Sequence, residues 1–231
     1  MHPTTDTLRR FWRECRGVLV FALLLFGFRS AWADWVDVPS GSMNPTILEG
    51  DRLLVDKHVY GLRLPWTLIR LSAGRDPARG EIVVFDSPAN GVSLVKRLVA
   101  VPGDTVALVD ERLIVNGVAA EYAAGDAAEI GELLAATRAL GPRVLVETGA
   151  APAHEILLLP NRLAPRSFDP LTVPPDRYFV LGDNRDNSAD SRYIGFVPRR
   201  NFVGHATRVV VSLDPERHYL PRSERLLRAL D

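Results

Sequence analysis

The chain has one strongly apolar stretch, Val18 to Phe28, and it lies close to the N-terminus. Its eleven residues are too few to cross a membrane, because a hydrocarbon core of about 30 Å takes about 20 helical residues. Extended over residues 17–35, the segment reaches that length. Basic residues precede it: Arg9, Arg10, Arg13 and Arg16. Because basic flanks stay cytoplasmic, we expect residues 1–16 to be a cytoplasmic tail and residues 17–35 a single-pass transmembrane anchor.

A cleavable signal peptide is the competing interpretation of this segment. A basic start, a short apolar core and the small-x-small sequence Ala31-Trp32-Ala33 are typical of one. Cleavage there would release a soluble domain beginning at Asp34. A serine in the next polar tract, Ser42, lies only nine residues beyond Ala33. Cleavage would remove that serine from the membrane surface, which favours an uncleaved anchor.

Composition limits the number of domains and the partners of the chain. Its 231 residues suit one folded domain plus an anchor. The formal net charge is zero, so no basic field indicates nucleic acid as a partner. The single cysteine, Cys15, precedes the apolar stretch, so no intrachain disulfide is possible.

After the anchor, the pattern is mostly that of β-strands separated by turn residues. The expected strands are Arg52–Val55, Glu81–Phe85, Val92–Val101, Thr105–Val109, Arg112–Val115, Tyr178–Leu181 and Phe202–Ser212. We expect a β-rich catalytic domain made of residues 36–118 and 176–215, followed by a C-terminal tail, 216–231. The tail is expected to contain a short amphipathic helix from Pro221.

Residues 119–175, called the insert below, have a different composition. They are rich in alanine and punctuated by proline, with one expected helix from Ala127 to Ala139 that Gly141-Pro142 would stop. We therefore predict a small subdomain inserted into the β-rich domain.

The tract Pro39-Ser-Gly-Ser-Met-Asn-Pro-Thr46 places a small serine, Ser42, between turn-forming residues. A serine hydroxyl is a poor nucleophile until a base removes its proton. Of the five histidines, His2 precedes the anchor and His218 lies near the C-terminus, which leaves His58, His154 and His205 as candidate bases. None lies in a recognisable triad motif, and no Gly-x-Ser-x-Gly elbow is present. A Ser-His-Asp arrangement stays open, because triads are assembled by the fold.

Lysine offers a second candidate base. Of the 28 basic residues, only Lys57 and Lys96 are lysines. Arginine cannot deprotonate in a protein, whereas a desolvated lysine can. On the expected strand, Lys96 shares one face with Leu94 and Leu98, and burial there would lower the pKa of its amine. A neutral amine near pH 7 to 8 is a competent general base. The alternative is an ordinary strand lysine with its ammonium in water.

The segment Gly182 to Arg192 is dense in Asp, Asn and Ser. A calcium loop counted from Asp186 would require Gly at Ser191 and Glu at Val197, and neither requirement is met. Interleaved arginines would also repel a cation, so we expect no metal. We predict a rigid loop held by Arg–Asp pairs, with an ordinary solvated turn as the alternative.

Three segments together resemble bacterial type I signal peptidases, also called leader peptidases. They are Pro39 to Thr46, Lys96-Arg97 with Val101 to Asp104, and Gly182 to Arg192 followed by Tyr193-Ile194-Gly195. Asp51 to Tyr60 and Asn201 to Gly204 also look like the family. The resemblance runs from the anchor to about Ser212, except for the insert.

The chain departs from the family pattern in places. Ile194 stands where an aromatic residue is common, and Val211 stands where a tryptophan is common. Longer members carry two membrane segments, whereas this chain supports one. These departures concern packing against the membrane more than catalysis.

The resemblance implies a site and a fold. Ser42 would be the nucleophile and Lys96 the general base, with the Ser40 hydroxyl and the Ser42 N–H stabilising the oxyanion. Ser188 would hydrogen-bond the Lys96 amine. The supporting ion pairs would come from Arg97, Asp183, Asp190 and Arg192. The fold would be a mostly β body of coiled antiparallel sheets, with an extended substrate beside a strand edge. No cofactor or metal is implied.

The function implied is a membrane-anchored serine endopeptidase that removes signal peptides from exported preproteins at small-x-small sites. Its partners would be signal peptides and, through the anchor, membrane lipid. It would sit in the bacterial inner membrane with the catalytic domain in the periplasm. A shallow apolar pocket for the small residues would be lined by Val36, Val38 and Val95.

Other functions stay open. A related Ser–Lys peptidase could serve a narrow client, as in conjugation or pilin maturation, or cleave itself as repressor-like proteases do. The lack of a DNA-binding segment counts against a repressor. The remaining alternative is a non-catalytic, membrane-anchored β scaffold.

Overall fold

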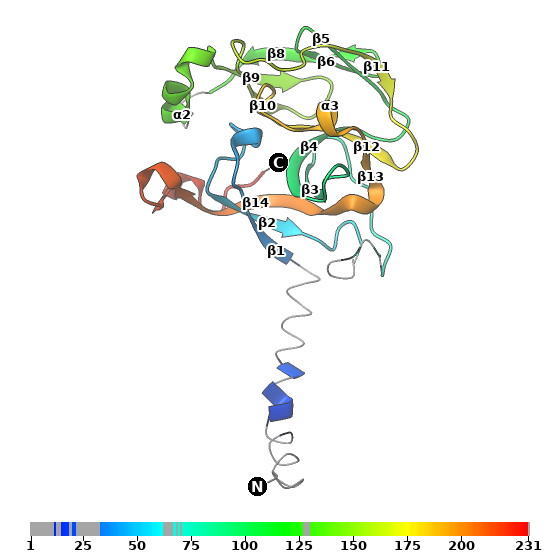
Figure 1. The fold of residues 1–231 in the computed structure, drawn as a ribbon, viewed down its shortest axis with the longest axis vertical. Coiled ribbons are helices and arrows are strands. Elements are labelled where there is room, and N and C mark those ends of the chain that lie inside the picture. Colours follow the sequence, from blue (N-terminus) through cyan, green and yellow to red (C-terminus); the bar gives the residue numbers. More distant parts are fainter. Residues whose placement is uncertain are drawn as a thin grey trace.

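A computed structural model of the chain describes residues 12, 15–18, 20–21, 33–61, 67, 69, 71–126 and 130–230. Three antiparallel sheets dominate it (Figure 1). The eight-stranded sheet contains β1 (Ala33–Asp37), β2 (Asp51–Asp56), β3 (Ile82–Asp86), β4 (Ser93–Ala100), β12 (Arg177–Leu181), β13 (Val197–Pro198), β14 (Phe202–Asp214) and β15 (Leu220–Pro221). The prediction of a mostly β, antiparallel fold is therefore confirmed.

Two smaller sheets complete the body. One has the order β11-β5-β6-β7, and the other has the order β10-β9-β8. Their strands are β5 (Thr105–Val109), β6 (Arg112–Val115), β7 (Val118–Ala119), β8 (Glu121–Ala124), β9 (Arg143–Thr148), β10 (His154–Leu158) and β11 (Phe168–Thr172). β5 and β6 have the predicted bounds, because their alternating apolar residues end at clear turns. Both small sheets lie at the upper end of the body in Figure 1.

The longest strand, β14, joins the central elements of the large sheet. It pairs with β3 near Phe202 and with β2 as far as Ser212. Register shifts along both pairings allow this strand to bend. β2 follows Ser42 in the sequence, and β3 pairs with β4, the strand that carries Lys96. By pairing with both β2 and β3, β14 fixes these two parts of the sheet relative to each other.

A buried apolar cluster lies beneath the segment that joins β1 to β2. We call this segment, residues 38–50, the serine loop. The cluster contains Val38, Met43, Ile47, Leu53, Val55, Ile82, Val84, Ala206, Val209 and Leu230. Because three of these side chains come from the serine loop itself, burial of apolar surface holds the loop against the sheet.

The insert is fastened to the body at two places. Its last strand, β11, pairs with β5, and the backbone of Leu157 in β10 bonds to Asp183 and Arg185. The helical part is shorter than expected: α2 spans Gly131–Ala136 and is followed by a 3-10 turn, Arg138–Leu140. The start of the expected helix, residues 127–129, lies outside the described residues.

The C-terminal segment does not form the expected amphipathic helix. It contains β15 and the 3-10 turns Pro215–Arg217 and Ser223–Arg225, and then runs back along β14. The amide of Val209 bonds to the carbonyl of Arg228, and the amide of Leu230 bonds to the carbonyl of Thr207. The backbone of the C-terminal segment thus hydrogen-bonds to β14 instead of forming the hydrogen bonds of a helix.

Within the described ranges, no helix is both long enough and apolar enough to cross a membrane. Most of the expected anchor, residues 17–35, lies outside those ranges, but its last three residues, 33–35, belong to β1 and pair with β2, so the expected end of the anchor is corrected.

Candidate active site

Ser42 lies in a 3-10 turn, η1 (Gly41–Met43), that opens directly after an extended Ser40. The amide of Asn44 bonds to the carbonyl of Gly41, and the amide of Ile47 bonds to the carbonyl of Met43. The Met43 side chain is buried in the apolar cluster, while Ser42 stays partly exposed. The turn therefore directs a serine outward from a loop that is fixed from below.

Lys96 lies on β4, opposite Val83 of β3. Its Nζ atom is 2.7 Å from the Oγ of Ser42 and 2.8 Å from the carbonyl oxygen of Val95. Only 2% of the lysine is exposed to solvent. The structure thus brings together the two residues that the sequence suggested as nucleophile and base, from segments 54 positions apart.

The electrostatic environment favours the neutral amine. Burial lowers the pKa of Lys96 to about 8, although the nearby carboxylates of Asp190 and Asp183 act in the opposite direction. An amine with this pKa is substantially deprotonated at mildly alkaline pH. When it is neutral, the same short contact allows the Ser42 hydroxyl to donate its hydrogen to Nζ.

Ser40 is exposed, and its Oγ lies 3.5 Å from the Oγ of Ser42. This places a second hydroxyl close to the Ser42 hydroxyl, on its exposed side. The expected oxyanion role of Ser40 requires a hydrogen-bond donor beside Ser42, because such a donor would stabilise the negative charge that develops on the substrate carbonyl oxygen during the reaction.

Ser188 is placed beside the dyad but does not make the expected hydrogen bond. Its buried Oγ has no hydrogen-bond partner among the described residues. The side chain lies against Gly182, where an added Cβ would be 2.3 Å from the Ser188 Oγ and 2.4 Å from the Ser42 carbonyl oxygen. The Lys96 amine instead donates to Val95, so the expectation that Ser188 bonds Lys96 is corrected for this structure.

The residues expected to support the site do form buried ion pairs. Arg97 binds Asp183 through two contacts of 2.9 and 2.8 Å, and both side chains are almost fully buried. Arg192 binds Asp190 in the same way at 2.9 and 2.8 Å. Asp190 also accepts the amide of Gly182 at 3.1 Å. These pairs fix the loop of residues 182–192 rather than leaving it as a solvated turn.

Two residues that fasten the 182–192 loop to the serine loop were not singled out from the sequence. Asn184 donates its side-chain amide to the Gly41 carbonyl at 2.9 Å and its backbone amide to the Ser42 carbonyl at 3.1 Å. Thr46 donates its hydroxyl to Asp183 at 2.6 Å. Thr46 lies in the segment Pro39 to Thr46 and Asn184 in the segment Gly182 to Arg192. Their place in these two family-like segments is the sequence feature that could have identified them.

The insert contributes a second buried polar group. Glu147 accepts two hydrogen bonds from Arg185, at 2.8 and 2.7 Å, and one from Tyr122 at 2.8 Å. His154 lies between Glu147 and Asp183, with its Nε2 3.5 and 4.0 Å from their carboxylate oxygens. Burial lowers the pKa of His154. The insert is thereby connected to the carboxylate that binds Arg97.

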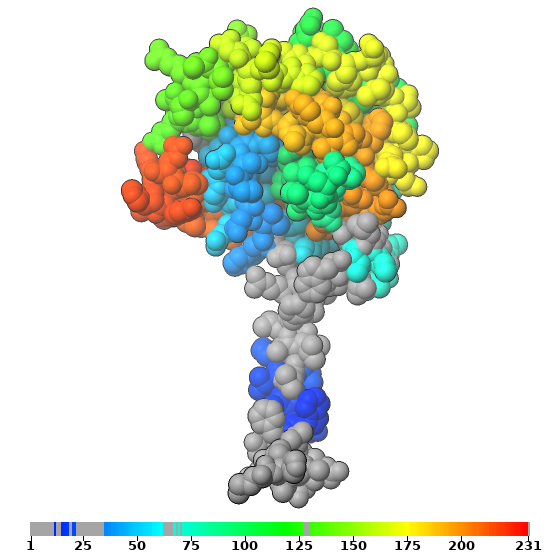
Figure 2. All heavy atoms as spheres, in the orientation of Figure 1, coloured from blue at the N-terminus to red at the C-terminus, as the bar shows by residue number. Residues whose placement is uncertain are grey.

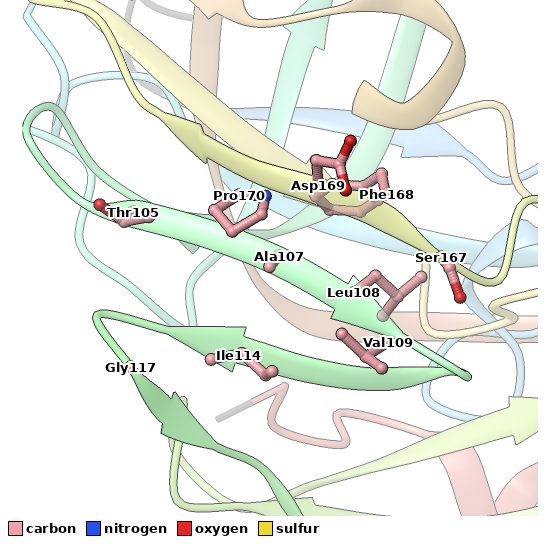
Figure 3. A pocket seen from close by; sticks show the side chains of 10 residues that line it. All are labelled: Thr105, Ala107, Leu108, Val109, Ile114, Gly117, Ser167, Phe168, Asp169 and Pro170. Atoms are coloured by element: carbon pink, nitrogen blue, oxygen red, sulfur yellow. The ribbon is translucent and has the colours of Figure 1, made fainter.

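The expected pocket residues lie around the apolar cluster near Ser42. Val38 is buried, and Val36 and Val95 are half-buried and pack against the cluster. Two cavities lie elsewhere. One, of about 580 Å³, is formed by β5, β6 and β11, where Ala107, Ile114 and Pro170 are among the lining residues (Figure 3).

The other cavity, of about 490 Å³, lies between α2 and the C-terminal segment. These two elements also meet through an Arg217–Glu132 ion pair, and Figure 2 shows the C-terminal segment in red beside the green residues of the insert. Neither cavity is lined by the dyad. Among the described residues, no group of three or more His, Cys, Asp or Glu side chains could hold a metal ion.

Comparison with known proteins gives consistent matches. The model of the signal peptidase family, peptidase S26, matches residues 12–211. Signal peptidase I of Pseudomonas aeruginosa is 38% identical over 226 residues, which cover 90% of this chain and 75% of that protein. Signal peptidase I of Pseudomonas fluorescens is 36% identical, with the same two coverages. Probable signal peptidase I-2 of Synechocystis is 34% identical, covering 84% of this chain and 71% of that protein.

A solved structure is also similar in sequence. The crystal structure of a signal peptidase I from Enterococcus faecalis is 38% identical and covers 58% of this chain and 98% of that chain, with a TM-score of 0.35.

Proposed function

The chain belongs to the signal peptidase family, peptidase S26, and on that premise we propose that Ser42 and Lys96 form its catalytic dyad. As a member of this family, the chain is a serine endopeptidase that removes signal peptides. The observation that carries the proposal is the 2.7 Å contact between the Ser42 hydroxyl and a buried lysine amine.

The proposed reaction begins when neutral Lys96 takes the proton of the Ser42 hydroxyl. The Ser42 oxygen attacks the scissile carbonyl carbon, and the carbonyl oxygen becomes an oxyanion. The Ser42 N–H and the Ser40 hydroxyl would donate to that oxyanion, and one such donor is typically worth about 3 kcal/mol in the transition state. The C–N bond then breaks, and the Lys96 ammonium protonates the leaving amine.

Deacylation would use the same base. Neutral Lys96 takes a proton from water, and the resulting hydroxide attacks the acyl ester on Ser42. When this second tetrahedral intermediate collapses, the Ser42 oxygen leaves and recovers its proton from Lys96. The signal peptide is released with a free carboxylate.

The free edge of β4 supports binding of an extended substrate. Residues 93–96 pair with β3 on one side, while β12 pairs with β4 only from Arg97 onward. Among the described strands, none covers the other edge of that first half of β4. A substrate strand added there would bring its backbone alongside Lys96 and the Ser42 hydroxyl.

Strand geometry also explains the proposed preference for small residues. In an extended peptide, the side chains one and three positions before the cut point to the same side. That side would face Val36, Val38 and Val95, which already pack against the apolar cluster. Little depth remains for a large side chain, so the proposed site selects small-x-small sequences.

The placement of the serine loop supports a membrane-anchored enzyme. β1 begins at Ala33, so the proposed anchor ends before that strand, and η1 follows β1 at Gly41. We propose a single-pass protein of the bacterial inner membrane, with its N-terminus cytoplasmic and its catalytic domain periplasmic. The dyad would then act close to the surface where signal-peptide cleavage sites emerge.

A preprotein cleavage assay in detergent tests the proposal. The wild-type protein should cut at a small-x-small site, and the N-terminus of the mature product should identify that site. Ser42→Ala and Lys96→Ala should each abolish cleavage while melting as the wild type does. Full activity in either variant would refute the dyad. A panel of unrelated preproteins separates a general enzyme from a peptidase dedicated to one client.

A further inference from the structure

Arg225 is a buried arginine in a mostly exposed C-terminal segment. Its relative exposure is 1%, whereas the two residues that follow it, Leu226 and Leu227, are more than half exposed. Its Nη2 donates to Asp51 at 2.6 Å and to the carbonyl oxygen of Thr46 at 3.0 Å. Its Nε donates to the same carboxylate at 3.2 Å. The guanidinium group thus contacts the serine loop from below.

Asp51 is fully buried and completes this arrangement. Besides binding Arg225, its carboxylate accepts the backbone amide of Leu48 at 2.9 Å. Placing two charges in the interior costs several kcal/mol per ion, and good geometry only repays that cost. The pair therefore contributes more to the geometry of the loop than to net stability.

Thr46 connects this ion pair to the active site. Arg225 binds its carbonyl oxygen, and Asp183 accepts its hydroxyl at 2.6 Å. Asp183 is in turn held by Arg97, the residue next to Lys96. The carbonyl of Thr46 is therefore fixed by the C-terminal segment and its hydroxyl by the 182–192 loop. Ser42 lies four residues before this double attachment.

The path of the chain agrees with these contacts. Leu230 joins Met43 and Ile47 in the apolar cluster, and Figure 1 shows the C-terminal end of the chain beside η1. Apolar contacts and a buried ion pair thus act on the same loop from the same segment.

We propose that Arg225 is a positioning residue for peptide cleavage. Through Asp51 and the Thr46 carbonyl, it fixes the loop that carries Ser42, although it touches no reacting atom. This inference rests on the proposed function of Ser42 and Lys96. Displacements of about 1 Å in a catalytic group can reduce the rate about 100-fold, so loss of this attachment should reduce kcat rather than substrate binding.

The test compares Arg225→Gln with Arg208→Gln in the full-length enzyme. Arg208 also fastens the C-terminal segment, by donating to the carbonyl oxygen of Leu227, but this hydrogen bond does not reach the serine loop. We expect Arg225→Gln to reduce kcat about 10- to 100-fold, with KM within about twofold of wild type. Arg208→Gln should retain wild-type kcat. Rates are expressed per folded enzyme, from near-UV circular dichroism at the assay temperature.

A double variant covers the case in which Arg225→Gln does not fold. Asp51→Asn combined with Arg225→Gln removes both buried charges, so no uncompensated ion remains to unfold the protein. A positioning role predicts that kcat stays low in the folded double variant. It also predicts that the single variant Arg225→Lys, which keeps a charge opposite Asp51, has a kcat between those of Arg225→Gln and the wild type. Wild-type kcat in the double variant, or in a folded Arg225→Gln, would overturn the inference. Activity in Ser42→Ala would instead refute the proposed function, so the two failures are distinct.

Discussion

The Nζ atom of Lys96 lies 2.7 Å from the Oγ of Ser42, and the lysine is almost completely withdrawn from solvent. An ammonium group in this position has lost most of its hydration, and the Asp190 and Asp183 carboxylates compensate only in part for that loss. The contact therefore joins the proposed nucleophile to an amine that gives up its proton more easily than an ordinary lysine. The proposed reaction depends on this property.

Activity should increase with pH. Burial lowers the pKa of Lys96 to about 8, and the active form is the neutral amine. We expect kcat/KM to rise about tenfold per pH unit below that pKa and to level off above it. Initial rates of peptide cleavage between pH 6 and 10 would measure the profile. A profile without an ionisation near pH 8 would contradict the assignment of the base.

Lys96→Arg should be inactive. Arginine keeps the positive charge but cannot deprotonate at any pH that the folded protein survives. We expect a loss of at least about 100-fold in kcat, the lower end for a missing general base. Lys57→Arg is the matched control, since it exchanges the other lysine of the chain. Substantial cleavage by Lys96→Arg at any pH would show that another group removes the proton.

Asp190→Asn should move the pH profile to lower pH. The Asp190 carboxylate raises the pKa of Lys96, so removing its charge should lower that pKa further. The same change leaves Arg192 buried without its partner and should destabilise the fold by about 3–5 kcal/mol. Kinetic profiles and thermal melts measure the two effects. Asp76→Asn, which removes an exposed carboxylate, is the control. An alkaline shift in Asp190→Asn would contradict the electrostatic account.

Gly182→Ala should impair both folding and cleavage. The new methyl group would meet the Ser188 side chain and the Ser42 carbonyl at distances well below normal contact. Either Ser188 or the serine loop must shift, and a shift of the loop moves the nucleophile. Gly131→Ala, with no heavy atom within 4 Å of the added carbon, is the control. Wild-type kcat and melting temperature in Gly182→Ala would show that the loops are not closely packed here.

Glu147→Gln should destabilise the protein. Glu147 neutralises buried Arg185, and its loss should cost about 3–5 kcal/mol in the free energy of unfolding. Despite its burial, the pKa of Glu147 is lowered, chiefly by Arg185. This stabilisation is present above the ordinary glutamate pKa and is lost as pH falls through the lowered value. Urea unfolding of both proteins between pH 3 and 7 should therefore show a smaller acid-induced loss in Glu147→Gln.

The sequence was sufficient to predict seven of the strands, β2 to β6, β12 and β14, and to suggest Ser42 and Lys96 as the proposed nucleophile and base. Alternating apolar residues between Gly, Pro and Asn turns defined β5 and β6 without error. Lys96 became a candidate because it is one of two lysines and stands between apolar neighbours on a strand, and the family resemblance then favoured it over an ordinary solvated lysine. The ion pairs of the 182–192 loop followed from alternating charges within one short segment.

Contacts between distant segments could not be predicted in this way. The Arg225–Asp51 pair joins residues 174 positions apart, and one arginine among many in a polar tail gives no local signal. The position of Ser188 depends on Gly182 and Ser42 from two other segments. His154 lies in the insert, yet its ring faces Asp183 beside the active site. Tertiary packing decides all three.

The ionisation of the Lys96 amine tests the central claim most directly. In the Lys57→Arg variant, Lys96 is the remaining lysine of the 231 residues, so a protein labelled with 13Cε-lysine gives one lysine side-chain signal. An NMR titration of that signal should give a pKa of about 8 and should agree with the kinetic profile. A pKa near 10.5, the ordinary value for lysine, would mean that the amine stays charged and cannot take the proton of Ser42.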